Sequence, residues 1–159
     1  SDKIVENISN HQLFLNKTEL KRLKLNSIDV ENFFAEELVS FDKVYKTTTA
    51  HTLQTNEFTK GIYSLIQQGY NQKLSGNIII IPNPSVIGSG NKKTGTTHGS
   101  GYSYDTHVPL IFFGKGIAQG ASSRYYPIID IAPTLANLLQ IEFPNGVTGK
   151  VIEEALDDD

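Results

Sequence analysis

The sequence predicts a fold of the α/β (or α+β) class, in which a small sheet carries helices packed on it. Four consecutive isoleucines, bounded by Gly76 and Pro82, are typical of a strand that is buried on both faces. Apolar side chains recur at helical spacing over residues 27–41, which indicates an amphipathic helix. Because strand and helix signals alternate along residues 1–84, these elements are expected to form one compact unit.

The first elements of this unit are short. Residues 1–10 are polar and predict either a loose start or an edge strand. Residues 11–16 are apolar and β-prone, as a short strand requires. Asn16 or Thr18 is expected to cap a turn after this strand, because the side-chain oxygens of Asn and Thr accept hydrogen bonds from exposed backbone N–H groups.

The helix over residues 27–41 is the clearest element, and Ser27 is its predicted N-cap. The expected apolar face comprises Val30, Phe33, Phe34, Leu38 and Phe41. Residues 43–53 are rich in β-branched and aromatic side chains and are expected to begin as a strand. Residues 57–68 predict a second helix that ends at Gly69.

The second half of the chain begins with a long loop. Residues 85–106 lack periodicity, which is uncommon inside a domain unless the loop is functional. Residues 108–113 predict a second buried strand. A helix is predicted over residues 132–140, with Pro133 in its first turn and Asp130 placed to cap it.

Composition limits the classes of partner. The 159 residues carry a net charge of −3, which argues against a nucleic-acid partner or an anionic membrane surface. No apolar run reaches the length of a membrane span. With no cysteine, neither a disulfide nor a thiolate metal site is possible. Since the chain also has no methionine, we expect it to be a piece of a larger enzyme, and we expect this piece to carry no signal peptide of its own.

The potential chemistry is concentrated in residues 95–114, which read GTTHGSGYSYDTHVPLIFFG. Two histidines, His98 and His107, stand in a loop of Gly, Ser, Thr and Tyr that runs into the predicted strand. A polar loop rooted in a buried strand is a common way for α/β enzymes to present functional side chains. Tyr102 and Tyr104 are expected to pack the loop rather than to bind a ligand.

This segment resembles the C-terminal metal-site segment of the alkaline phosphatase superfamily. It is most similar to the secreted, zinc-dependent phosphate-monoesterase branch, which is related to nucleotide pyrophosphatase/phosphodiesterases. The resemblance continues through DIAPTLANLLQIEFPNGVTGKVIEEAL downstream and GYNQKLSGNIIIIPNP upstream, and covers roughly residues 61–156. One departure is Gly101, where relatives often carry proline, so this loop is expected to be less rigid.

The resemblance implies a layout and a location. Residues 1–159 are expected to form a single compact C-terminal domain of a larger enzyme that is periplasmic or secreted. Within it, about residues 1–84 would be an insertion-like part, and about residues 85–156 would hold the metal loop and complete the core. The N-terminal remainder of the parent chain would be the partner of this segment.

The resemblance also implies a role for one histidine. In this superfamily the histidine of the His-Gly pair is the last ligand of one of two zinc ions, and His98 occupies that place. His107 is either a ligand in its stead or a residue that positions the loop. Asp105, two residues before His107, could fix the His107 tautomer, as carboxylates do behind metal-bound imidazoles. His11 and His51 are interpreted as structural.

The expected activity is hydrolysis of phosphate monoesters by the parent enzyme. The resemblance implies that the Thr or Ser nucleophile and the other Asp and His ligands lie upstream, so the isolated chain should be inactive and should bind zinc weakly. A phosphodiesterase or a sulfatase-like hydrolase of the same superfamily is an alternative. A non-catalytic α/β domain for packing or partner binding is another. Residues 88–95, GSGNKKTG, lack the spacing of a phosphate-binding loop.

Overall fold

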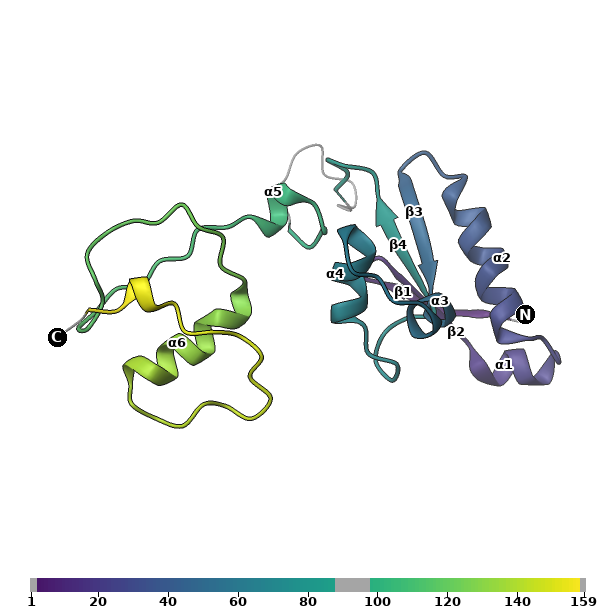
Figure 1. Cartoon of the computed structure of the whole chain (residues 1–159). Coiled ribbons are helices and arrows are strands. Elements are labelled where there is room, and N and C mark those ends of the chain that lie inside the picture. The colour runs from purple at the N-terminus through teal and green to yellow at the C-terminus, as the bar shows by residue number, and fades with distance from the viewer. Residues whose placement is uncertain (1–2, 88–97, 158–159) are drawn as a thin grey trace. The chain divides into compact units, whose positions relative to one another are not determined.

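Figure 1 shows a computed structural model of the chain. It describes residues 3–87 and 98–157, so residues 88–95, which we do not expect to bind phosphate, lie outside the described residues. The chain divides into two compact units between Val108 and Pro109. Each unit is described by itself. The division into an insertion-like and a core-completing part stays a prediction.

The first unit is built on a four-stranded sheet. Its strands are β1 (Val5–Ser9), β2 (Gln12–Leu15), β3 (Val44–Thr49) and β4 (Ile78–Pro82). They lie in the order β1-β2-β4-β3, and each neighbouring pair is antiparallel. With helices packed on this sheet, the predicted fold class is confirmed.

His11 lies in the turn between β1 and β2. Asn10 and His11 both have positive φ, 49° and 58°, and they connect Ser9 to its partner Gln12. Two consecutive left-handed residues are the signature of the tight turn that matches the twist of a hairpin. His11 therefore serves the turn in this structure, in line with the structural role expected for it.

The isoleucine run forms the centre of the sheet. Ile78 is fully buried and Ile81 is 3% exposed, and an odd spacing along a strand places the two side chains on opposite faces. The strand is therefore covered on both faces, as predicted. The cover is incomplete, because Ile79 and Ile80 are only half-buried.

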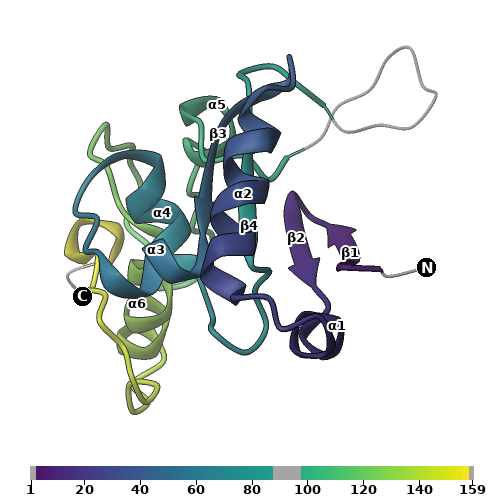
Figure 2. The same ribbon diagram turned by 90° about the vertical axis from the view of Figure 1, so that its right-hand side faces the viewer.

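Over residues 3–87, four helices accompany this sheet: α1 (Lys17–Arg22), α2 (Ser27–Val39), α3 (Ala50–Thr55) and α4 (Gly61–Gly69). In Figure 2, α2 runs along β3 and β4. Its side chains join a core that also contains Leu13, Leu15, Leu20 and Ile78. The helix predicted over residues 57–68 begins later, at Gly61, and α3 follows β3 without having been predicted.

Capping at the start of the first two helices partly follows the prediction. Asn16 caps α1 as expected, accepting from the N–H groups of Thr18 and Glu19. The predicted N-cap of α2 is wrong, since Asn26 holds that position and accepts from the next turn. Ser27 instead donates its hydroxyl to Glu31, at 3.2 Å.

The predicted apolar face of α2 is also wrong at two positions. Phe33 is 59% exposed and Phe41 is 62% exposed. Val30, Phe34 and Leu38 do pack on the core, because a spacing of four residues keeps them in one stripe. Phe33 points away from that stripe, and Phe41 lies beyond the end of the helix at Val39.

The second unit contains a helix, α6 (Ile131–Leu138), and two single 3-10 turns, η1 (Ile128–Asp130) and η2 (Glu153–Ala155). The predicted strand over residues 108–113 is wrong for this chain. No strand is assigned there, and Ile111 is 81% exposed while Phe113 is fully exposed. A strand is held by hydrogen bonds to a neighbouring strand. No described segment of this unit forms a strand that pairs with these residues.

A buried polar cluster ties the end of the chain to α6. Asp130 precedes the helix as predicted, but the predicted side-chain cap is wrong. Oδ1 of Asp130 instead accepts a hydrogen bond from the Lys150 N–H at 2.8 Å. Thr134, which is fully buried, donates its hydroxyl to the Asp130 carbonyl at 2.6 Å and accepts from the Ile152 N–H at 2.9 Å.

The stability of the protein is therefore expected to be sensitive to substitution of Thr134. Thr134→Val keeps the shape of the side chain but leaves the Ile152 N–H and the Asp130 carbonyl without this partner. Each buried polar group left unpaired costs about 1–3 kcal/mol, so the free energy of unfolding should fall by about that amount or more. Denaturant unfolding measures it, with the exposed Thr148→Val as the control. Equal stability of the two variants would contradict the role assigned to Thr134.

Candidate functional site

The loop that carries the two histidines is anchored at the end of β4 by two tyrosines. The Tyr102 hydroxyl donates to the Pro82 carbonyl at 2.7 Å, and the Ser85 N–H donates to the Tyr104 hydroxyl at 3.0 Å. The two rings stack with their centroids 5.6 Å apart. Burial raises the pKa of the Tyr102 hydroxyl, and the neighbouring Tyr104 adds to the rise. The tyrosines therefore pack the loop, as the sequence predicts.

Gly101 lets the loop approach α4 closely. A Cβ built on Gly101 would lie 2.8 Å from Cγ1 of Ile62, closer than real Cβ contacts come. A larger residue here would displace the Ile62 side chain or move the loop. The absence of proline at this position therefore accompanies a tight contact, whereas the lower rigidity expected of the loop stays a prediction.

Asp105 holds the loop together from within. It lies in α5 (Ser103–Thr106), and its Oδ2 accepts from the Ser100 N–H at 2.9 Å and from the Ser100 hydroxyl at 2.5 Å. These bonds hold the pKa of the Asp105 carboxyl below its usual range, the hydroxyl bond most strongly, and the charge of His98 lowers it further. The carboxylate is thus an acceptor for Ser100 rather than the partner expected for His107.

The two candidate metal ligands differ in their setting. His98 is exposed and is followed by Gly99, whose φ of 111° is a backbone conformation that side-chain-bearing residues rarely adopt. His107 is also exposed, and its backbone N–H donates to the Ser103 carbonyl at the end of α5. Both candidate ligands are therefore accessible from solvent.

The described residues do not form a complete metal site. Among residues 3–87 and 98–157, no three Asp, Glu, His or Cys side chains gather as metal ligands do. A catalytic zinc ion takes three protein ligands and one open position. An exposed imidazole is a suitable zinc donor, so this chain fits a zinc site as the source of one or two ligands and not as its sole source.

His51 lies elsewhere, beside a buried carboxylate that the sequence did not reveal. The backbone N–H of His51, in α3, donates to Oε2 of Glu31 at 3.3 Å, and the amide of Asn77 donates to Oε1 at 3.0 Å. Glu31 is only 5% exposed and joins α2 to α3 and to the start of β4. Its place on the edge of the apolar stripe of α2 was the only available signal.

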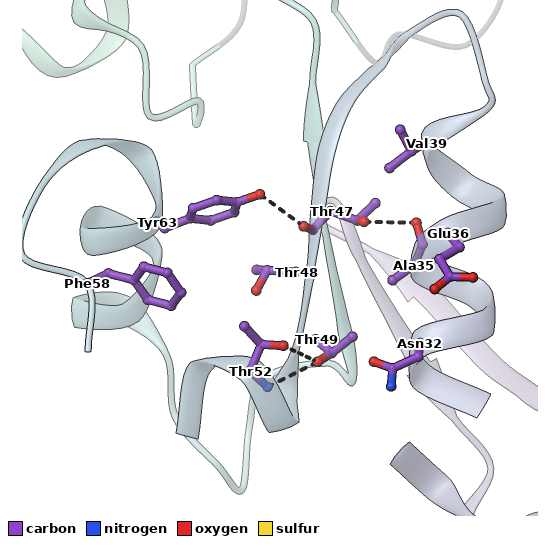
Figure 3. Close-up of a pocket in the computed structure, with 10 residues that line it drawn as sticks. All are labelled: Asn32, Ala35, Glu36, Val39, Thr47, Thr48, Thr49, Thr52, Phe58 and Tyr63. Atoms are coloured by element: carbon purple, nitrogen blue, oxygen red, sulfur yellow. Dashed lines mark hydrogen bonds between the residues drawn. The ribbon is translucent and has the colours of Figure 1, made fainter. Parts of the chain in front are cut away.

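Two hollows of the first unit lie away from His98 and His107. One of them has a volume of about 390 Å³. It lies beside β3, with α2 on one side and α3 and α4 on the other (Figure 3). Tyr63 donates to the Thr47 carbonyl there, and the buried Thr48 hydroxyl has no partner among the described residues. A second hollow, of about 730 Å³, includes Glu31 and His51. Neither lining contains His98 or His107.

Comparison with known proteins places these features in a family. No family model matches the chain. The alkaline phosphatase PafA of Elizabethkingia meningoseptica is 37% identical over 156 residues, which is 98% of this chain and 28% of the relative. This chain also matches the crystal structure of wild-type PafA with a TM-score of 0.88. The match covers 99% of this chain and 30% of the PafA chain. This chain belongs to the alkaline phosphatase superfamily.

Two further relatives match nearly the full length of this chain. The alkaline phosphatase PhoV of Synechococcus elongatus is 31% identical over 152 residues, or 94% of the chain and 27% of that protein. A protein of Myroides odoratus named a calcium-transporting ATPase is 35% identical over 159 residues. The chain spans less than a third of the length of these relatives. Among the described residues, no helix has the length and apolar character needed to cross a bilayer.

Proposed function

We propose that this chain is the C-terminal part of a zinc-dependent, alkaline phosphatase-like hydrolase that cleaves phosphate monoesters. The observation that carries the proposal is the match to PafA along almost the whole chain, at 37% identity and a TM-score of 0.88. Two relatives that match over nearly the whole chain bear the name alkaline phosphatase, which favours phosphate esters over sulfate esters. The Thr or Ser nucleophile and the other ligands would lie in the remainder of the parent chain.

The proposed task of this chain is to present one zinc ligand. His98 would bind the metal, with His107 as the alternative ligand or as a residue that positions the loop. Zinc, when bound by the complete ligand set, activates a hydroxyl nucleophile and stabilises the charge on phosphoryl oxygens. Within this chain, the loop that carries His98 is held by the Tyr102 bond to β4 and by the Asp105 bonds to Ser100.

The remainder of the parent chain is the proposed partner, and the small phosphate ester is the proposed substrate. Residues 108–113 support this partner, because they combine strand-forming side chains with the exposure of Ile111 and Phe113. Exposed apolar side chains in one segment are typical of a surface that a partner covers. In line with the resemblance, we propose that the parent enzyme is exported to the periplasm or secreted.

The isolated 159 residues are expected to be inactive, because one or two imidazoles cannot replace the full zinc ligand set. The test compares hydrolysis of a phosphate monoester, a phosphodiester and a sulfate ester by the isolated chain and by the full-length protein, both at saturating zinc. The proposal expects monoester hydrolysis by the full-length protein alone. Robust hydrolysis by the isolated chain would contradict the proposal. A full-length protein that cleaves only the diester or the sulfate ester would also contradict it.

A further inference from the structure

One carboxylate ties together the two ends of the histidine loop. Both hydrogen bonds to Oδ2 of Asp105 come from Ser100, one from the backbone N–H at 2.9 Å and one from the hydroxyl at 2.5 Å. The Tyr102 N–H in turn lies 3.4 Å from the Ser100 hydroxyl oxygen. Ser100 follows His98 by two residues, so these bonds fix the backbone directly after that histidine.

We propose that Asp105 is a positioning residue for His98. By holding Ser100 through two hydrogen bonds, it fixes the backbone segment that follows His98. This inference rests on the proposed function, because it takes His98 to be a zinc ligand. It differs from the expectation drawn from the sequence, in which Asp105 served His107.

The chemistry of the contact favours a charged acceptor at this position. The Asp105 carboxylate accepts both of its hydrogen bonds from Ser100, and an ionised carboxylate can only accept hydrogen bonds. Hydrogen bonds to a carboxylate are stronger than those between neutral groups. Carboxylates and other partners that orient a metal-bound histidine typically contribute 10–100-fold to metal affinity.

Ser100 stands between two glycines, so its position depends on the contacts that hold it. Gly99 has positive φ and open space around it, whereas Gly101 lies close against Ile62. Because glycine gives the backbone more freedom than any other residue, the His98 end of the loop depends on specific bonds for its geometry. In the described part of the loop, Ser100 is held by the two Asp105 bonds and by the Tyr102 N–H, which donates to its hydroxyl oxygen.

The test measures zinc affinity rather than activity, in the full-length protein. The variants are Asp105→Ala, Asp105→Asn and Ser100→Ala, with Asp42→Asn as the control, because Asp42 is an exposed acid in the same unit. Zinc dissociation constants come from competition with a chelator, and the melting temperature of the metal-free protein reports the fold. Asp105→Ala should weaken zinc binding by about 10–100-fold, with a smaller loss for Ser100→Ala and none for Asp42→Asn. The metal-free melting temperature should be unchanged in Asp105→Asn.

The outcomes separate this inference from the proposed function. If His98→Ala loses zinc while both Asp105 variants bind zinc as tightly as the wild type, the positioning role is overturned and the proposed function stands. If His98→Ala keeps the zinc affinity of the wild type, the proposed function fails and this inference fails with it. If Asp105→Ala does not fold, Asp105→Asn decides by the same measurement.

Discussion

Replacing His98 by alanine in the full-length protein is expected to remove one zinc ion per subunit and nearly all phosphate-monoester hydrolysis. Lewis-acid stabilisation by a metal ion is worth several kcal/mol in the transition state, and about 1.4 kcal/mol corresponds to a factor of ten in rate. The value of kcat/KM should therefore fall by at least about 1000-fold. Metal analysis and steady-state kinetics on the same preparation measure both effects.

Two further variants make this result specific. His51→Ala replaces an exposed helical histidine in the same unit, so it should keep both its zinc and its activity. His107→Ala distinguishes the two candidate ligands, because it should lose far less zinc than His98→Ala if His98 is the ligand. The reverse order would assign the zinc to His107. Normal activity in both single variants would remove the loop from the chemistry.

Replacing Gly149 by alanine is expected to be the most damaging small change in the second unit. A Cβ at this position would overlap the Ile129 carbonyl and lie 2.9 Å from the Asp130 nitrogen. These neighbours are backbone atoms, which cannot rotate aside. Overpacking typically costs 1–3 kcal/mol, and a backbone clash places this variant at about 3 kcal/mol or more. Lys150 and Asp130, which meet next to this contact, would be forced apart.

Gly120→Ala provides the matched control, because a Cβ built on Gly120 meets nothing within 4 Å. Native-state hydrogen exchange can follow the effect locally, since the Ile152 N–H is bonded to the buried Thr134 hydroxyl. Exchange of this amide should accelerate strongly in Gly149→Ala and remain at the wild-type rate in Gly120→Ala. Equal protection in the two variants would show that the backbone approach at Gly149 is not needed for stability.

Local signals in the sequence were sufficient for the elements whose stability is local. Asn16 caps a helix because its side chain reaches the N–H groups of Thr18 and Glu19, and that geometry involves only nearby residues. The isoleucine run became β4 because a continuous apolar stretch between turn residues has few other stable conformations. The same reasoning found α6 from its apolar spacing and from Pro133 in the first turn.

The errors concern features that depend on distant residues. Asp130 does not cap α6 through its side chain, because the Lys150 N–H, 20 positions away, takes its carboxylate. Glu31 is buried because Asn77 and the His51 backbone provide donors, and no pattern near residue 31 reveals them. Residues 108–113 have the composition of a strand, but a strand also requires a partner, which composition cannot supply.

The candidate site shows the same division. The sequence identified the loop and its two histidines from their types and spacing, and the tyrosines were correctly assigned to packing. It paired Asp105 with His107 because the two are close in sequence. The structure pairs Asp105 with Ser100, since the turn into α5 folds the carboxylate back toward the other end of the loop. The roles of His98 and His107 toward zinc stay predictions.

The most direct measurement of the central claim is a crystal structure of the full-length protein grown with zinc, with anomalous data collected on both sides of the zinc absorption edge. We predict a zinc peak with a His98 ring nitrogen at about 2.0–2.1 Å and the other ligands drawn from outside these 159 residues. A zinc site whose ligands exclude His98, or no zinc peak near this loop, would contradict the account.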